Sequence, residues 1–192
     1  MMERSSSFIS LSGLSGVSAG GIGLITSYIL DYKIGPFTSR DITVFLTADK
    51  RNELLIFCSG LCIVSLVVTF LAVFFFTSRK AKKKGLSVWD ASAKRLVVNL
   101  FIPLIAGGLF CLILIYHYFD WLVIPSMLIF YGLALINASK YTLNELRWLG
   151  ICEVILGLLA AFFLGKSILF WGIGFGVMNI IYGAMMYFKY ER

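Results

Sequence analysis

The chain has 192 residues, of which 59% are hydrophobic and only 14% are charged, and its mean hydropathy is +0.90. A soluble domain carries roughly a quarter charged residues, so this composition excludes a water-soluble globular protein and indicates a membrane protein. The formal net charge is +7. Because the basic residues cluster at the ends of apolar runs, the charge favours contact with anionic lipid headgroups over nucleic acid.

Six apolar segments approach or exceed the length that a helix needs to cross a hydrocarbon core of about 30 Å. They predict an all-α polytopic membrane protein, with residues 1–192 forming a single transmembrane helical domain. The first segment lacks the basic start of a signal peptide and is longer than its usual apolar core, so we interpret it as a retained helix. The predicted spans are about 8–30, 54–77, 97–118, 121–138, 146–165 and 168–188.

Lysine and arginine counts in alternate loops predict the orientation. One side of the predicted bundle holds twelve of the 17 basic residues, and the other side holds five. Four of those five lie in the first outer loop, where acidic residues accompany them, but acidic residues count little in this rule. We therefore expect a multi-pass protein of the inner (cytoplasmic) membrane with both termini in the cytoplasm.

A basic run follows the second span and consists of Arg79, Lys80, Lys82, Lys83 and Lys84. Such a run either fixes topology as a stop-transfer flank or binds anionic headgroups specifically, at about 1 kcal/mol per charge near the surface. Apolar residues at helical spacing between positions 86 and 97 then predict a short helix that lies on the cytoplasmic surface and runs into the third span.

Local patterns predict one helix start, two kinks and a packing face. Residues 142–145 match a capping box and place the start of the fifth span near Leu143. Pro103 and Pro125 can kink the third and fourth spans. Small residues on the first and last spans permit close helix approach, either within the chain or in a homo-oligomer. They are Ser12, Gly16 and Gly20 on the first span and Gly172, Gly176 and Gly183 on the last.

Glu153 is the acidic residue inside a predicted span, and an intramembrane carboxyl is by default a functional hypothesis. Neighbouring spans are antiparallel, so residues equally far from the turn between them lie at the same depth in the membrane. This places Asn179 and Tyr131 near the depth of Glu153. Burial would keep the carboxyl neutral, and a hydrogen-bonded group of this kind can carry a proton or coordinate a small cation. The alternative is structural: Glu153 reaches water at the inner interface, or it forms an interhelical hydrogen bond with Asn179 that stabilises helix packing. No span shows the break that forms transporter sites.

Other candidate sites are weak. Cys58 and Cys62 share a helix face, but neither His nor carboxylate accompanies them, so we expect no metal site. His117 lies at the outer end of the third span among aromatic residues, where a role in pH sensing is a minor alternative. The sequence contains no catalytic triad, paired carboxylates or HExxH motif. We therefore expect no enzymatic activity and no cofactor.

Several blocks of the sequence carry a family resemblance. They are residues 8–17, 79–86, 89–91, 103–111, 138–142 and 170–176. Together they resemble a family of small, uncharacterised multi-pass bacterial inner-membrane proteins, over essentially the whole chain. The resemblance implies a membrane location and no particular activity, cofactor or set of binding residues.

Three functions are compatible with this sequence. The first is a structural, regulatory or partner-binding membrane component without enzymatic activity, which the small loops and the basic cytoplasmic surface favour. The second is a small transporter or channel subunit for protons or small cations that uses the Glu153 layer. The third is a lipid-modifying enzyme, which the scarcity of polar intramembrane residues disfavours.

Overall fold

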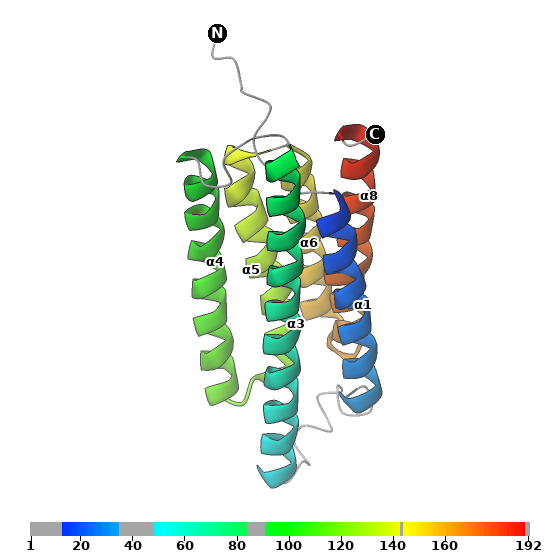
Figure 1. Cartoon of the computed structure of the whole chain (residues 1–192). Helices are drawn as coiled ribbons and strands as arrows, with labels where there is room; N and C mark the ends of the chain where they lie inside the picture. The colour runs from blue at the N-terminus through cyan, green and yellow to red at the C-terminus, as the bar shows by residue number, and fades with distance from the viewer. Residues whose placement is uncertain (1–12, 35–47, 84–90, 143, 191–192) are drawn as a thin grey trace.

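The computed structural model describes residues 13–34, 48–83, 91–142 and 144–190, and these form an all-α bundle (Figure 1). Short 3₁₀ turns, η2 to η4, join several of the helices. The last helix is continuous but changes its winding along its length. The elements are α1 (Gly13–Ile34), α3 (Ala48–Lys83), α4 (Ala91–Tyr116), α5 (Val123–Ala138), α6 (Asn144–Phe162), and a last helix made of α7 (Ser167–Trp171), the π-helical segment η5 (Gly172–Met178) and α8 (Asn179–Tyr190).

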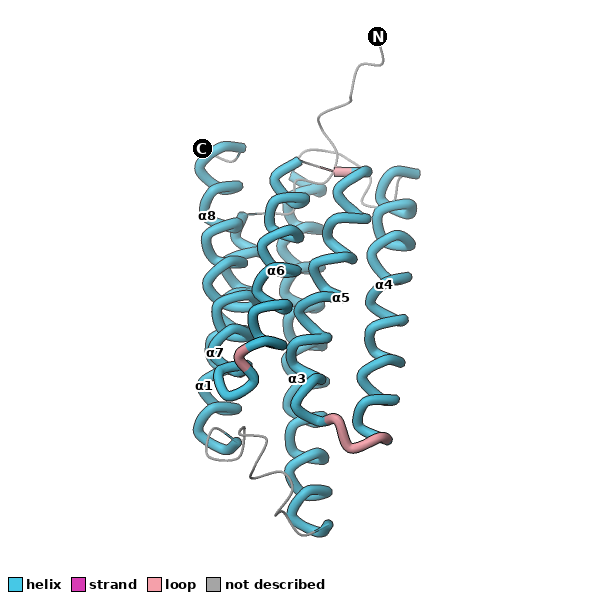
Figure 2. The backbone as a smooth tube through the Cα atoms, turned by 180° about the vertical axis from the view of Figure 1, so that it is seen from behind, coloured by secondary structure: helices cyan, strands magenta, loops and turns pink. Residues whose placement is uncertain are grey.

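Successive helices run in opposite directions, as Figures 1 and 2 show from two sides. The start of α1 and the end of α8 therefore lie at the same end of the bundle, which we call the inner end after the orientation predicted from the Lys and Arg counts, and we call the opposite end the outer end. The turns from α4 to α5 and from α6 to α7 lie at the outer end. This arrangement matches the predicted alternation of six helices in the described part of the chain.

Five described helices are long and apolar enough to cross a membrane: α1, α3, α4, α5 with its flanking turns, and the last helix from Leu164 to Lys189. The predicted fifth span, 146–165, corresponds to α6. This helix carries Glu145, Arg147 and Glu153 within 19 residues and is not among the five. It nevertheless packs against α5 and the last helix over its length.

The helix boundaries agree with the predictions at one point and correct them at another. Helix α6 begins at Asn144, next to the predicted start near Leu143, which lies outside the described residues. The predicted surface helix begins within residues 84–90, also outside the described part. Its later residues belong to α4 itself, where Ala93 and Leu96 are buried within the bundle.

The two prolines lie in different parts of their helices. Pro103 is inside α4, whereas Pro125 is the third residue of α5. The first-turn N–H groups of a helix have no intrahelical acceptor, so Pro125 removes no helical hydrogen bond. The sequence-based reason for a kink therefore applies to Pro103 alone.

The glycines of α1 pack against the last helix within the same chain. A Cβ atom at Gly16 would lie 2.7 Å from the Cα of Gly183, and one at Gly20 would lie 2.5 Å from the carbonyl oxygen of Gly176. Only residues without a side chain allow the two backbones this close. The small-residue stripe is thus used for intrachain packing.

A second glycine contact joins α5 to α6. A Cβ atom at Gly132 would lie 2.6 Å from the Gly150 carbonyl oxygen, and one at Gly150 would lie 2.7 Å from the Gly132 carbonyl oxygen. Gly157 meets the backbone of Ile129 in the same way. This contact was not predicted, although Gly150 and Gly157 are two helical turns apart and share one face of α6.

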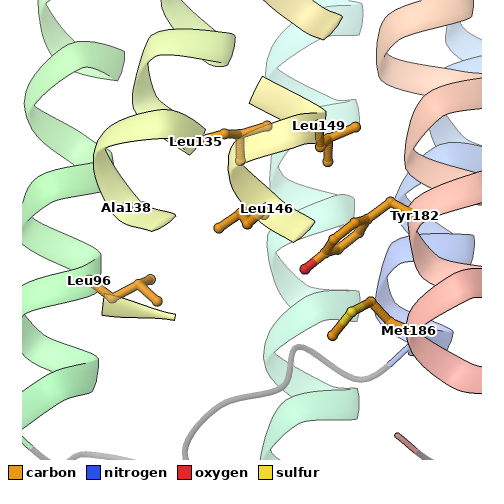
Figure 3. Close-up of a cluster of buried hydrophobic side chains, with 7 residues drawn as sticks. All are labelled: Leu96, Leu135, Ala138, Leu146, Leu149, Tyr182 and Met186. Atoms are coloured by element: carbon orange, nitrogen blue, oxygen red, sulfur yellow. The ribbon is translucent and has the colours of Figure 1, made fainter. Parts of the chain in front are cut away.

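Two apolar clusters fill the bundle. The inner cluster, shown in Figure 3, joins α4, α5, α6 and α8 through Leu96, Leu135, Ala138, Leu146, Leu149, Tyr182 and Met186. The outer cluster consists of Leu30, Leu128, Ala160, Ile168 and Trp171. On each of α5, α6 and the last helix, a polar residue lies between its inner and outer members: Tyr131, Glu153 and Asn179, respectively.

Candidate functional site

Glu153 projects from α6 into the interior of the bundle and is 0% exposed. Neither of its carboxyl oxygens has a hydrogen-bond partner within residues 13–34, 48–83, 91–142 and 144–190. Its Oε2 atom and the Cδ2 atom of Leu128 both lie where a side chain at Gly174 would begin. The absence of a Cβ atom at position 174 therefore makes room for the carboxyl group between α5, α6 and the last helix.

Asn179 and Tyr131 form the hydrogen-bonded part of this layer. The Tyr131 hydroxyl donates to Asn179 Oδ1 at 3.1 Å. The Asn179 side-chain nitrogen in turn donates to the carbonyl oxygens of Gly174 at 3.2 Å and Phe175 at 3.3 Å. The Tyr131 ring stacks on the Phe175 ring with centroids 4.7 Å apart. The two residues thus tie α5 to the last helix, and we call them the Tyr131–Asn179 clamp.

The clamp contacts the π-helical segment η5, because the carbonyls that Asn179 binds belong to it. A π-helix pairs each N–H with the carbonyl five residues back, and such segments occur frequently at functional sites. Where the winding returns to α-helical at Asn179, the Asn179 amide binds two carbonyls of the π segment. The last predicted span is therefore not a regular α-helix, which the hydrophobic pattern did not predict.

The structure brings the three predicted residues into one layer but pairs only two of them. Glu153 approaches the clamp through Gly174, whose carbonyl oxygen accepts the hydrogen bond from Asn179. The structural alternative for Glu153 required either access to water or a hydrogen bond to Asn179. Among the described residues the carboxyl is fully buried and has no hydrogen-bond partner, so the structure shows no bond from Glu153 to Asn179.

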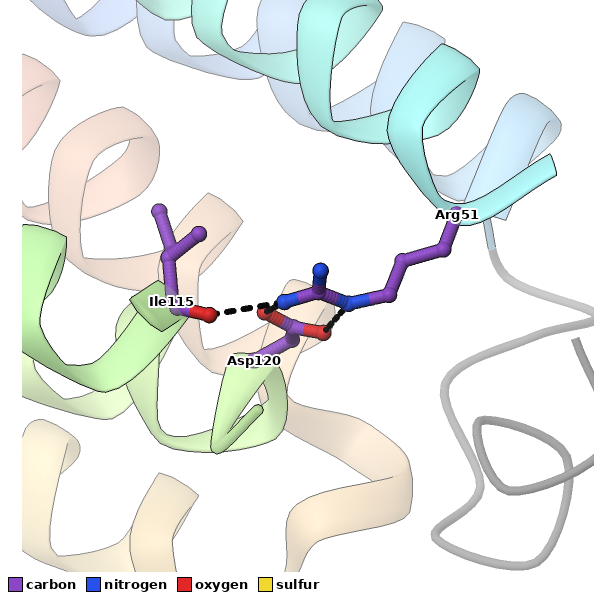
Figure 4. A network of polar contacts seen from close by, with 3 residues as sticks. All are labelled: Arg51, Ile115 and Asp120. Carbon is purple, nitrogen blue, oxygen red and sulfur yellow. Dashed lines mark hydrogen bonds and ion pairs between the residues drawn. The ribbon is translucent and has the colours of Figure 1, made fainter. Parts of the chain in front are cut away.

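A second polar cluster lies at the outer end and was not predicted (Figure 4). Arg51 on α3 donates to both Asp120 oxygens, from Nε at 2.7 Å and from Nη2 at 2.9 Å, and Nη2 also donates to the Ile115 carbonyl at 2.7 Å. The guanidinium group lies 4.1 Å from the ring centroid of Tyr118, whose φ of 63° is unusual for a residue with a side chain. Arg51 thus anchors α3 to the turn between α4 and α5.

Two further polar contacts hold the inner half. Lys189 on α8 pairs with Glu145 on α6. Asn137 on α5 donates to the Asn99 carbonyl on α4 at 2.9 Å and to its side-chain oxygen at 3.2 Å. Polar contacts of this kind are a common source of helix association in lipid.

The predicted lipid-binding run is only partly described. Helix α3 continues to Lys83, and Arg79 is exposed near its end. The side chains of Lys80, Lys82 and Lys83 and the whole of Lys84 lie outside the described parts. The interaction of this run with anionic headgroups stays a prediction.

Within the residues that the structure describes, no three His, Cys, Asp or Glu side chains gather where they could hold a metal ion. The four cysteines are free thiols, and Cys58 and Cys62 are half-buried on α3.

Comparison with known proteins found no matching family model, no matching curated protein and no matching solved structure. The resemblance to small bacterial inner-membrane proteins therefore stays a prediction.

Proposed function

We propose that this chain is a multi-pass inner-membrane protein without enzymatic activity that acts as a small transporter or channel subunit for protons or small cations. The single observation that carries the proposal is the fully buried Glu153 carboxyl, which has no hydrogen-bond partner among the described residues. The five long apolar helices support the membrane location, and the Lys/Arg asymmetry supports cytoplasmic ends.

The chemistry follows from the cost of burying a charge. An ionised carboxylate without partners is strongly disfavoured in an apolar interior. It must therefore be neutralised by a bound proton or by another small cation. A group that alternates between a neutral, occupied state and a charged, empty state performs the elementary step of cation transfer.

Proton and sodium flux test this proposal. The purified full chain is reconstituted in liposomes that contain a pH-sensitive dye, and a potassium gradient with valinomycin sets the membrane potential. We expect proton flux above that of empty vesicles in the wild type and its loss in Glu153→Gln. Sodium uptake, measured in parallel with a radioactive tracer, shows which cation occupies the site.

The matched control is Glu53→Gln, which removes an exposed carboxyl from the outer part of α3. It should leave the flux unchanged. Wild-type flux equal to that of empty vesicles contradicts the transporter function, and equal loss of flux in both variants contradicts the assignment to Glu153.

A second function, a structural, regulatory or partner-binding component, is favoured by a different observation. The apolar stretch of α3 has no buried residue, although 39–44% of the corresponding stretch is buried in α1, α5 and the last helix. The outer faces of α3 are therefore free for lipid or for helices of another protein. Absence of flux in the liposome assay would favour this function.

A further inference from the structure

A hydrogen-bonded contact between α4 and α5 places two cations side by side near the inner end. Asn137 on α5 donates to the backbone and side-chain oxygens of Asn99 on α4, and the Asn99 side-chain nitrogen donates to the Arg95 carbonyl. Arg95 lies one helical turn from Asn99 toward the inner end. Lys140 in η3 lies three residues beyond Asn137 in the same direction. Because η3 also packs against α4, the two cations lie at a similar level on adjacent elements, and Figures 1 and 2 show α4 and α5 side by side.

Neither Arg95 nor Lys140 has an anionic partner in the described part of the chain. Both side chains are exposed, and no ion pair with another described residue includes either of them. Glu145, at the same end of the bundle, pairs with Lys189. The axes of packed helices are about 8–10 Å apart, so two long basic side chains on them repel each other and can reach one common anion. A phosphate group suits both, because a guanidinium binds it through parallel N–H donors and an ammonium binds it as a point charge.

Exposed apolar side chains continue from the two cations toward the outer end. Ile102 lies three residues after Asn99 on α4 and is 60% exposed. Leu133 lies four residues before Asn137 on α5 and is 43% exposed. Spacings of three and four residues keep both side chains on the faces that carry the two asparagines. We call this set the α4–α5 edge, and its members are Arg95, Lys140, Ile102 and Leu133.

We propose that the α4–α5 edge binds an anionic phospholipid. Arg95 and Lys140 hold the headgroup phosphate, and the acyl chains cover the apolar side chains below them. Both cations lie two residues outside the predicted spans 97–118 and 121–138, which is the level of the headgroups. The order of cations, amides and apolar groups along the edge matches a phospholipid from headgroup to tail, whereas a dissolved phosphate would leave the apolar part uncovered.

This site is separate from the two features described above. It shares no residue with the basic run at 79–84, and its cations come from α4 and η3 instead of α3. It also uses no residue of the Glu153 layer, so it does not rest on the proposed function. Glu153→Gln should therefore leave lipid binding unchanged, and absence of cation flux would not contradict the lipid site.

Photocrosslinking of the full chain in lipid nanodiscs tests this site. The nanodiscs consist of phosphatidylcholine with a small fraction of phosphatidylglycerol that carries a diazirine close to its headgroup, and mass spectrometry identifies the crosslinked peptides. We expect crosslinks within residues 91–102 and 133–142, and their loss when unlabelled phosphatidylglycerol is added. Arg95→Gln and Lys140→Gln should each reduce the yield there about fivefold, which corresponds to about 1 kcal/mol for one basic residue near the surface.

Two matched controls separate this site from general surface charge. Lys94→Gln removes an exposed cation from the same turn of α4 but from a different face, because neighbouring residues in a helix point about 100° apart. Lys166→Gln removes an exposed lysine from the corresponding turn at the outer end. Both should leave the crosslink yield nearly unchanged, and the yield at residues 79–84 should be the same in all variants.

Three results overturn the proposal. Equal losses in Lys94→Gln and Arg95→Gln would show attraction by overall charge, and equal crosslinking by a phosphatidylcholine probe would show contact without selection for an anion. Displacement of the probe by dissolved glycerol phosphate would identify a soluble phosphate as the ligand. Thermal unfolding shows whether each variant is folded, and if Arg95→Gln is not, an unchanged yield in Lys140→Gln is sufficient to overturn the site.

Discussion

At the scale of single residues, the Glu153 side chain is completely buried, and its carboxyl forms no hydrogen bond with any residue in the described part of the chain. Its Oε2 atom lies where a side chain at Gly174 would begin, which ties the site to the π-helical segment. A side chain at position 174 and the carboxyl cannot occupy the same space. The contact is therefore open to a direct genetic test.

Gly174→Ala is expected to destabilise the protein by about 1 kcal/mol, the lower end of the cost of overpacking, because the atoms it meets are the ends of the Glu153 and Leu128 side chains, which can shift. Part of the loss should be recovered in Gly174→Ala with Glu153→Ala, because the shortened side chain vacates the space. Unfolding in mixed detergent micelles measures both, and strictly additive effects would show that the two residues do not touch.

Arg51 and Asp120 give a second prediction at this scale. Asp120→Asn removes the charge that both guanidinium donors contact, and we expect a loss of about 1–2 kcal/mol because the pair is bidentate and mostly buried. Asp31→Asn removes an exposed carboxylate at the same end of the bundle and should have little effect. Equal effects of the two variants would contradict the anchoring of α3 by Arg51.

At this scale, the sequence predicts how deep a residue lies in the bundle better than it predicts the direction in which its side chain points. Reflecting neighbouring spans across their turn placed Glu153, Tyr131 and Asn179 in one layer, because antiparallel helices share a common rise per residue. It did not predict which two would bond, since that depends on the rotation of each helix. Arg51 and Asp120 escaped notice because they are 69 residues apart and their helices are not consecutive.

At the scale of elements, the pairing of α5 with α6 determines where Glu153 points. Gly132 and Gly150 bring the two backbones into contact, and this fixes the rotation of α6 against α5. The predicted stripes on α1 and the last helix were correct, since regular spacing of small residues is visible along one segment. The α5–α6 contact needs one glycine from each helix, and a single glycine on α5 leaves no pattern in the sequence.

Gly150→Leu should therefore destabilise the bundle by at least about 2 kcal/mol, because the side chain would meet the backbone of α5, which cannot move aside as a flexible side chain can. Gly60→Leu on α3 is the matched control, since nothing lies within 4 Å of a Cβ atom there. Thermal unfolding of the two variants in the same detergent compares them. Equal stability would contradict the close α5–α6 contact.

At the scale of the whole molecule, composition and apolar segment lengths predicted most of the architecture. The six predicted spans correspond to the six helices in the described part of the chain, and five of them are apolar enough to cross a membrane. The exception, α6, is also the helix that carries Glu153. The three charged residues of α6, Glu145, Arg147 and Glu153, set it apart from the other five helices, and it packs against α5, η5 and α8.

Cysteine labelling tests the proposed topology. Lys140→Cys at the inner end and Lys166→Cys at the outer end both replace exposed lysines in short turns. In a background with the four native cysteines changed to serine, a membrane-impermeant maleimide should label position 166 in intact cells. It should label position 140 only after permeabilisation. The reverse pattern would contradict the cytoplasmic placement of the inner end.

The most direct test of the central claim, a neutral carboxyl held inside the bundle, is an infrared spectrum of the protein in lipid at neutral pH. Wild type minus Glu153→Gln should show the carbonyl stretch of a protonated carboxyl that exchanges slowly in D₂O, since Glu153 is shielded from solvent. A difference spectrum that shows only an ionised, rapidly exchanging carboxylate would contradict the buried site and the function built on it.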